Sequence, residues 1–195
     1  MENKRGAVPP GYREALYWKL SANIWRYLGI NLLSIPLAAL AGAIFLPLGM
    51  WAGASIGSGL QAVNLFFSLL SIVSTLIFHE LAHGLAMMTF GAKPRYGVKA
   101  SALYATASGY AFTRNQYLIV ALAPLVSLSL LALLGILVFS KTALVPAFVL
   151  GAVVNAAGAC GDVYMGWLTA RYPVAAYVID EEDGMRVFLP MQNAG

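Results

Sequence analysis

The sequence contains a single cysteine, Cys160, among its 195 residues. One cysteine cannot form an internal disulfide, and it cannot by itself build a cysteine-rich zinc site. A metal bound by this chain would therefore need histidine and carboxylate ligands. Cys160 is two residues from Asp162, so on a helix it would point to a different face, and packing as a small residue explains it.

Charged side chains are also scarce. Asp, Glu, Lys and Arg together make up 10% of the chain, whereas 60% of the residues are apolar and the mean hydropathy is +0.75. A soluble domain usually has about 25% charged residues. The composition therefore indicates an integral membrane protein, with the lipid bilayer as a partner. The net charge of +4 does not indicate a nucleic-acid partner, because the basic residues flank apolar segments.

Long apolar runs define the expected architecture. A helix crosses about 30 Å of hydrocarbon with roughly 20 residues. Lipid leaves no backbone group unpaired, so spans should be helical, and Pro36 and Pro47 predict a kink in the first one. We expect an all-α transmembrane fold of about four membrane-spanning helices, with short β-hairpin-like cytoplasmic segments. The four candidate spans lie at about 28–51, 63–90, 117–139 and 144–170.

The length of the chain favours one domain. We expect residues 1–195 to form a single integral-membrane domain, with an N-terminal segment 1–27, a membrane core 28–170 and a tail 171–195. Residues 1–23 lack the basic start, short apolar core and cleavage site of a signal peptide, so we expect this segment to be retained. No pattern in the sequence indicates an oligomeric state.

The distribution of Lys and Arg predicts the orientation. Five basic residues precede the first span and four lie between the second and third spans, whereas the 52–62 loop has none. Basic residues concentrate on the cytoplasmic side of a membrane. We therefore expect a multi-pass protein of the cell membrane with both termini in the cytoplasm, in which the second and fourth spans run in the same direction.

Two connecting segments have the composition of short strands. Residues 97–112 are rich in small, β-branched and aromatic residues and include Gly109. The tail has two apolar runs on either side of an acidic turn at residues 181–184, which favours a β-hairpin. Irregular loops are the alternative for both segments.

The chain has only two histidines, and they are four residues apart. The stretch His79-Glu80-Leu81-Ala82-His83 has the H-E-x-x-H pattern, in which two imidazoles one helical turn apart can bind the same Zn²⁺. This stretch lies inside the second apolar span. The sequence therefore predicts a zinc ion held by His79 and His83 within the membrane core.

The acidic residues identify a third candidate ligand. Of the eight, two lie in the N-terminal segment and four, at 180–183, belong to the predicted turn of the tail. Glu80 and Asp162 remain inside the spans, where a lone carboxylate is costly and marks a functional site. At about 1.5 Å per residue, His79, His83 and Asp162 lie roughly 12–18 Å from the cytoplasmic end. Two histidines, a carboxylate and an open position for water form a common catalytic zinc site.

Glu80 is the candidate catalytic residue. In the H-E-x-x-H pattern the glutamate accepts a proton from the water that zinc activates, and later delivers it to the leaving amine. The implied reaction is hydrolysis of a peptide bond. Asn155, on nearly the same helix face as Asp162, is a candidate oxyanion donor or substrate contact. A hydrogen bond between helices is an equally good interpretation of Asn155.

These residues resemble the zinc-dependent intramembrane proteases of the site-2 protease type and, more closely, a family of small membrane zincin peptidases. By this resemblance, Asp162 completes the zinc site as the aspartate of a later core helix, and the substrates are transmembrane or membrane-associated polypeptides. The similarity runs from about residue 70 to the end. Besides H-E-x-x-H it is carried by Gly91-Ala92-Lys93, RNQYLIVALAPL at 114–125, GACGDVYMGWL at 158–168 and VIDEEDG at 178–184.

The resemblance also implies how a substrate is presented. Site-2 proteases take up a substrate segment that unfolds and adds as a strand near the site, which implies such a role for residues 97–112. The chain departs from the usual Asn-x-x-Pro and Leu-Asp-Gly stretches, with Asn155-Ala156-Ala157-Gly158 and Gly161-Asp162-Val163 in their place. This departure bears more on the substrate inference than on the ligand assignment.

Other classes of protein also place ionisable groups inside a membrane. The main alternative is a non-catalytic metal-binding membrane protein or a metal permease. A permease needs a polar path across the whole membrane, yet beyond these groups the spans contain mostly Ser, Thr and Asn. A structural zinc would normally have a fourth protein ligand, for which no spare histidine exists. A prenyl-protein type of protease would favour a glutamate ligand on a later helix, which the sequence lacks.

Overall fold

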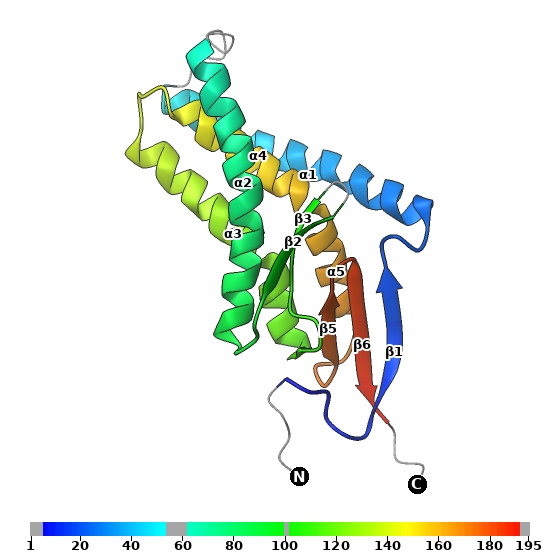
Figure 1. Cartoon of the computed structure of the whole chain (residues 1–195). Helices are drawn as coiled ribbons and strands as arrows, with labels where there is room; N and C mark the ends of the chain where they lie inside the picture. The colour runs from blue at the N-terminus through cyan, green and yellow to red at the C-terminus, as the bar shows by residue number, and fades with distance from the viewer. Residues whose placement is uncertain (1–5, 54–61, 100–101, 192–195) are drawn as a thin grey trace. The chain divides into compact units, whose positions relative to one another are not determined.

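The computed structural model describes residues 6–53, 62–99 and 102–191 (Figure 1). The protein is mostly helical, with several short antiparallel strands. In chain order its elements are β1 (Tyr12–Lys19), α1 (Ile24–Trp51), α2 (Ala62–Thr89), β2 (Arg95–Lys99), β3 (Ala102–Thr106), β4 (Ala111–Thr113), α3 (Arg114–Val138), α4 (Val145–Gly158), α5 (Cys160–Ala170), β5 (Tyr177–Glu181) and β6 (Gly184–Pro190).

The chain divides into two compact units. The first, which we call the sheet unit, consists of residues 1–29, 80–123 and 161–195. The second, the helical unit, consists of residues 30–79 and 124–160. Helices α1, α2 and α3 each run from one unit into the other without interruption.

Three described helices are long and apolar enough to cross a membrane. They are α1, residues 65–89 of α2, and α3. Helices α4 and α5 meet the same criterion only as a pair, and this pair is bent by 47°. The structure therefore has three candidate spans, or four if the bent pair is one span, and is compatible with a membrane protein.

The main bend lies in the fourth predicted span. Pro36 and Pro47 lie inside α1, which is assigned as one continuous helix. The single helix expected at 144–170 is instead interrupted at Ala159. Glycines stand on both sides of this interruption, and glycine is a weak helix former because it loses the most backbone freedom. The span expected at 144–170 is therefore a bent pair of helices.

The sheet unit contains a four-stranded antiparallel sheet in the order β1-β6-β5-β4. Figure 1 shows β5, β6 and β1 side by side. The predicted tail hairpin is confirmed, since β5 and β6 pair up to Glu181↔Gly184. Alternate residues of β5, Val178 and Asp180, are buried. This alternation defines the face of the strand that packs inward.

The N-terminal segment contributes a strand that the sequence did not predict. β1 pairs with β6 along its length, with a register shift between Glu14 and Leu16. Trp18 is its one fully buried residue, so the segment lacks the regular apolar alternation that marks a strand. Its pairing uses backbone groups that almost any residue provides. The expectation of an all-α fold with hairpins alone was wrong in this respect.

The predicted 97–112 hairpin is partly correct. β2 and β3 form an antiparallel hairpin that begins at Arg95 and ends at Thr106, while residues 100–101 at its turn lie outside the described residues. The end of the predicted segment belongs elsewhere, because β4 pairs with β5 through Ala111↔Ile179. In the turn between β3 and β4, Gly109 has φ +83°, a left-handed conformation that suits glycine.

The helical unit has an apolar core formed by α1, α3 and α4. Phe148 stacks on Phe139, with ring centroids 5.6 Å apart. A Cβ added to Gly135 would overlap the Phe148 ring, so the glycine lets α4 approach α3 closely. The buried members of this core are Ala41, Phe45, Ala52, Ala132, Ile136, Val145, Val149, Ala152 and Ala156.

Candidate metal centre

Helix α2 carries the H-E-x-x-H stretch. His79 and His83 lie one turn apart on the same helix face, and both are buried, with 7% and 8% of their surface exposed. The boundary between the two units falls just after His79, within the continuous helix. The position of one imidazole relative to the other is therefore set by α2 itself.

His83 is held by a backbone carbonyl of α3. Its Nδ1–H donates to the carbonyl oxygen of Val120 at 2.9 Å. In an α-helix this carbonyl would accept from the residue four positions later, which is Pro124 and has no N–H. Because Pro124 has no N–H to donate, the carbonyl oxygen of Val120 is available to accept the hydrogen bond from His83. With the proton on Nδ1, the lone pair of His83 lies on Nε2.

His79 has an equivalent partner on α4. Its Nδ1 lies 3.0 Å from Oδ1 of Asn155, an acceptor, so the nitrogen donates. The amide Nδ2 of Asn155 donates to the carbonyls of Pro124 at 3.2 Å and Leu125 at 3.5 Å. Asn155 is only 1% exposed. The amide is thus oriented by α3 and fixes the tautomer of His79, with the lone pair on Nε2.

Asp162 lies in the first turn of α5, directly after the bend. Its Oδ1 is 3.3 Å from Nε2 of His83. One ligand atom from each of His79, His83 and Asp162 lies within 4.8 Å of the other two. The structure thus brings together the three residues that the sequence singled out as ligands. The first turn of a helix also suits a carboxylate electrostatically, because the backbone N–H groups there carry partial positive charge.

This donor set fits zinc. Two imidazole nitrogens and one carboxylate oxygen are ligands that Zn²⁺ takes in catalytic sites, with a fourth position for water. In a tetrahedron with metal–ligand distances of about 2.0–2.1 Å, neighbouring ligand atoms are about 3.3 Å apart. The separation of His83 Nε2 and Asp162 Oδ1 has this value. His79, His83 and Asp162 are therefore the residues that would hold the metal.

Glu80 is half-buried and follows His79 on α2. At about 100° per residue, its side chain leaves the helix on the face next to that of the two histidines. In the H-E-x-x-H pattern a carboxylate in this position would lie beside the metal without being one of its three ligands. Four residues later on the same face lies Gly84, which is buried.

The comparisons with known proteins bear on this stretch. Residues 72–177, more than half of the chain, match the family described as "putative zincin peptidase". The chain belongs to this family. No curated protein and no solved structure matches the chain.

The matched segment of the zincin peptidase family contains all the candidate site residues. It begins in α2 ahead of His79 and ends where β5 starts. Membership supports a zinc metallopeptidase, and it agrees with a donor set that suits zinc.

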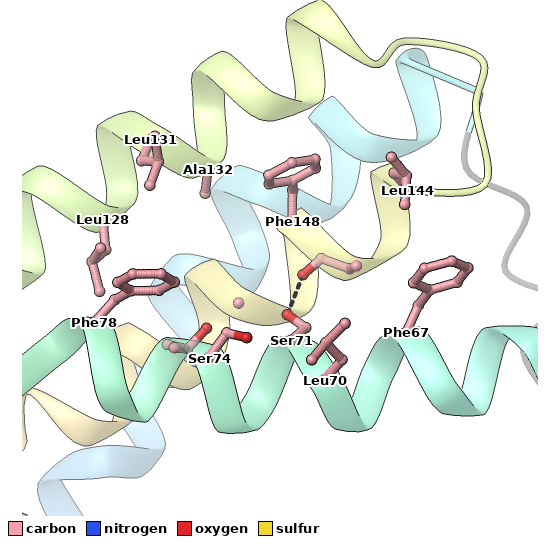
Figure 2. A pocket seen from close by; sticks show the side chains of 13 residues that line it. Phe67, Leu70, Ser71, Ser74, Phe78, Leu128, Leu131, Ala132, Leu144 and Phe148 are labelled. Atoms are coloured by element: carbon pink, nitrogen blue, oxygen red, sulfur yellow. Dashed lines mark hydrogen bonds between the residues drawn. The ribbon is translucent and has the colours of Figure 1, made fainter.

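An apolar cavity lies in the helical unit of this zincin peptidase family member, along the part of α2 that precedes His79. Its volume is about 350 Å³, and Figure 2 shows its walls on α2, α3 and α4. Ser71 donates to the carbonyl of Ala147 at 2.6 Å across one side of it. A Cβ on Gly151 would lie 3.1 Å from Oγ1 of Thr75 and 3.2 Å from Oγ of Ser71. The cavity residues are Phe67, Leu70, Ser71, Ser74, Thr75, Phe78, Leu128, Leu131, Ala132, Leu144, Ala147, Phe148 and Gly151.

The position predicted from the sequence was wrong for one acidic residue, Asp180. Asp180 was expected in the turn of the tail, but it lies in β5 and is 8% exposed. The hydroxyl of Tyr117 donates to its Oδ1 at 3.4 Å, and its Oδ2 has no hydrogen-bond partner among the described residues. Burial raises the pKa of Asp180 to about 7. The alternation of β5, which places Asp180 on the face of buried Val178, is the signal that could have identified it.

Proposed function

We propose that the protein is an intramembrane zinc endopeptidase of the site-2 protease type. The observation that carries this proposal is the metal centre, in which His79 and His83 each donate Nδ1–H to an acceptor and Asp162 lies 3.3 Å from His83. Three zinc ligands and an adjacent glutamate are the groups that zinc-dependent peptide hydrolysis uses. Family membership supports the metallopeptidase class.

Each residue has a defined role in the proposed reaction. His79, His83 and Asp162 would hold the zinc, which when bound would act as a Lewis acid and lower the pKa of water. Glu80 accepts one proton from the attacking water, whose oxygen forms a bond to the carbonyl carbon while the π pair moves onto the carbonyl oxygen. When that pair returns, the C–N bond breaks and its electrons stay on nitrogen, which takes the proton from Glu80. The products are an amine and a carboxylic acid, which then ionises to its carboxylate by releasing its proton to solvent.

The proposed substrates are transmembrane or membrane-adjacent polypeptides. Large apolar side chains on α2, including Leu69, Val73 and Ile77, are exposed over most of the helix length, which suits a lipid environment. Strands β2 and β3 pair with each other and form a two-stranded sheet. An extended segment of substrate can add to such a sheet by backbone hydrogen bonds. We propose that the protein lies in the cell membrane with both termini in the cytoplasm, which the distribution of basic residues supports.

The proposal is tested by replacing Glu80, the proposed general base. Zinc-loaded wild type in detergent is incubated with casein and with synthetic transmembrane peptides, and new termini are identified by mass spectrometry. We expect cleavage by wild type, its loss in Glu80→Gln, and equal zinc content in both, because Glu80 is not a ligand. The control Glu14→Gln removes an exposed carboxylate in β1 and should cleave normally. Cleavage that persists in Glu80→Gln would exclude this mechanism.

A further inference from the structure

We propose that Tyr96 is a catalytic residue whose hydroxyl donates a hydrogen bond to the carbonyl oxygen of the peptide bond under attack. This inference rests on the proposed peptidase function and adds a group that H-E-x-x-H does not include. Tyr96 lies in β2 and comes from outside the metal-binding helices. Its position relative to α2 carries the argument.

The Tyr96 side chain packs directly on α2, against Gly84. A Cβ added to Gly84 would overlap the Tyr96 hydroxyl oxygen and would lie 2.6 Å from Cζ and 3.0 Å from Cε1 of the ring. The hydroxyl therefore occupies the place where any larger residue would have its Cβ. Glycine at position 84 is the residue type that admits the phenol to the helix backbone. Both residues belong to the sheet unit.

This place on α2 is adjacent to the catalytic groups. Gly84 directly follows the ligand His83 and lies four residues after Glu80. Residues four apart on a helix have Cβ positions about 5–6 Å apart on the same face. The Tyr96 hydroxyl therefore lies on the Glu80 face of the helix, beside a ligand. A substrate carbonyl that meets the water held by Glu80 must approach this face.

Tyr96 is only partly covered by the rest of the protein. The residue as a whole is 49% exposed, which leaves part of it open to a substrate. It pairs with Ala105 in the β2–β3 hairpin. The next residue, Gly97, is covered by Tyr104 from the opposite strand, and successive residues of a strand point to opposite faces. Tyr96 and Tyr104 therefore lie on opposite faces of the same hairpin.

The proposed reaction needs a donor at the carbonyl oxygen. During attack this oxygen gains the π pair, and a hydrogen bond to it there typically accelerates such reactions by about 10²–10³-fold. Asn155, the donor considered from the sequence, uses its amide N–H groups on the carbonyls of Pro124 and Leu125. A tyrosine hydroxyl donates one hydrogen bond while keeping its proton. The Tyr96 hydroxyl, which lies against Gly84, is a donor on the Glu80 face of α2.

The decisive variant is Tyr96→Phe, which removes one oxygen and leaves the ring. With a peptide that wild type cleaves, we expect kcat to fall about 10²-fold with KM and zinc content unchanged. A phosphinic dipeptide, whose tetrahedral phosphinate mimics the attacked carbonyl, should bind the zinc-loaded variant at least 10-fold more weakly by calorimetry. Acetohydroxamate, which contacts the metal alone, should bind both proteins equally. Tyr12→Phe, which removes a phenol oxygen from β1, is the control and should behave as wild type.

A second variant tests the position of the hydroxyl. Gly84→Ala keeps the phenol but displaces it, so kcat and phosphinate affinity should fall as in Tyr96→Phe. Unchanged kcat and phosphinate affinity in Tyr96→Phe would overturn the assignment, and so would a loss of zinc from this variant, which indicates a structural role. If wild type cleaves no peptide, the proposed function fails, whereas the phosphinate comparison still decides whether Tyr96 faces the metal.

Discussion

Single residues set the chemistry of the metal centre through their backbone partners. Pro124 carries no functional group, yet its missing N–H leaves the Val120 carbonyl able to accept from His83. Its own carbonyl accepts from the Asn155 amide, which in turn holds His79. One proline thus acts on both histidines, and partners of this kind orient a ligand and raise its basicity.

We predict that Pro124→Ala weakens zinc binding while the helix remains. The new N–H at position 124 competes with His83 for the Val120 carbonyl, so we expect about 10–100-fold lower zinc affinity, as for other losses of partners that orient metal ligands. Competition titration with a zinc-sensitive dye measures it. The control Pro47→Ala alters a proline inside α1 and should leave zinc affinity unchanged. Equal affinities in all three proteins would contradict this role.

Asp180 makes a separate prediction, on pH. Burial raises its pKa from 3.8 to about 7, so the folded protein holds a proton that the unfolded chain has lost. The stability from this proton is complete below about pH 4 and is lost as the pH rises through about 7. Three pKa units correspond to about 4 kcal/mol. Asn cannot ionise, and its carbonyl can still accept from Tyr117.

The metal-free Asp180→Asn variant should therefore match wild type near pH 4 and be more stable by a few kcal/mol at pH 8. Thermal unfolding in detergent across this range measures the difference. Glu14→Gln, an exposed carboxylate change in β1, serves as the control. A constant difference between Asp180→Asn and wild type at every pH would exclude the titration of this carboxyl as its cause.

At the scale of elements, α2 and α4 pack through matched positions four residues apart. Within the helical unit, Ser71 bonds to the Ala147 carbonyl, Thr75 lies against Gly151, and His79 bonds to Asn155. The numbers rise together, so the two helices run in the same direction, as the distribution of basic residues predicted for the second and fourth spans. Small residues on α4 permit this close approach.

We predict that Gly151→Leu destabilises the protein by about 1–3 kcal/mol, since a side chain there must displace Ser71 and Thr75. It should also reduce zinc affinity, because the same helix pair aligns Asn155 with His79. Gly29→Ala is the control, because a Cβ there meets nothing within 4 Å. Thermal unfolding and zinc titration of both variants provide the measurements. An unchanged midpoint for Gly151→Leu would show that α2 and α4 tolerate separation at this point.

At the scale of the whole molecule, the sequence predicted what depends on local spacing. The pair His79 and His83, the third candidate ligand Asp162 and the tail hairpin all follow from periodicity and from the cost of burying charge. The features that the sequence did not predict depend on contacts between residues far apart in the chain. β1 is a strand because β6 lies beside it, and Val120 becomes a partner of His83 only when α3 packs on α2.

The same limit explains the misplaced carboxyl and the broken span. Asp180 reads as part of an acidic turn because its neighbours are acidic, whereas its burial results from the packing of β5. The interruption at Ala159 places Asp162 at the start of a new helix. Nothing local distinguishes this glycine-flanked position from the other small residues of α4.

The most direct test of the account is the zinc content of detergent-purified protein, measured by mass spectrometry of the metal. We predict about one zinc per chain in wild type, less in Asp162→Ala, and none in the His79→Ala, His83→Ala double variant, because these residues supply the three ligands. Wild type without zinc after metal-replete purification, or a double variant that keeps it, would contradict the metal centre and the peptidase built on it.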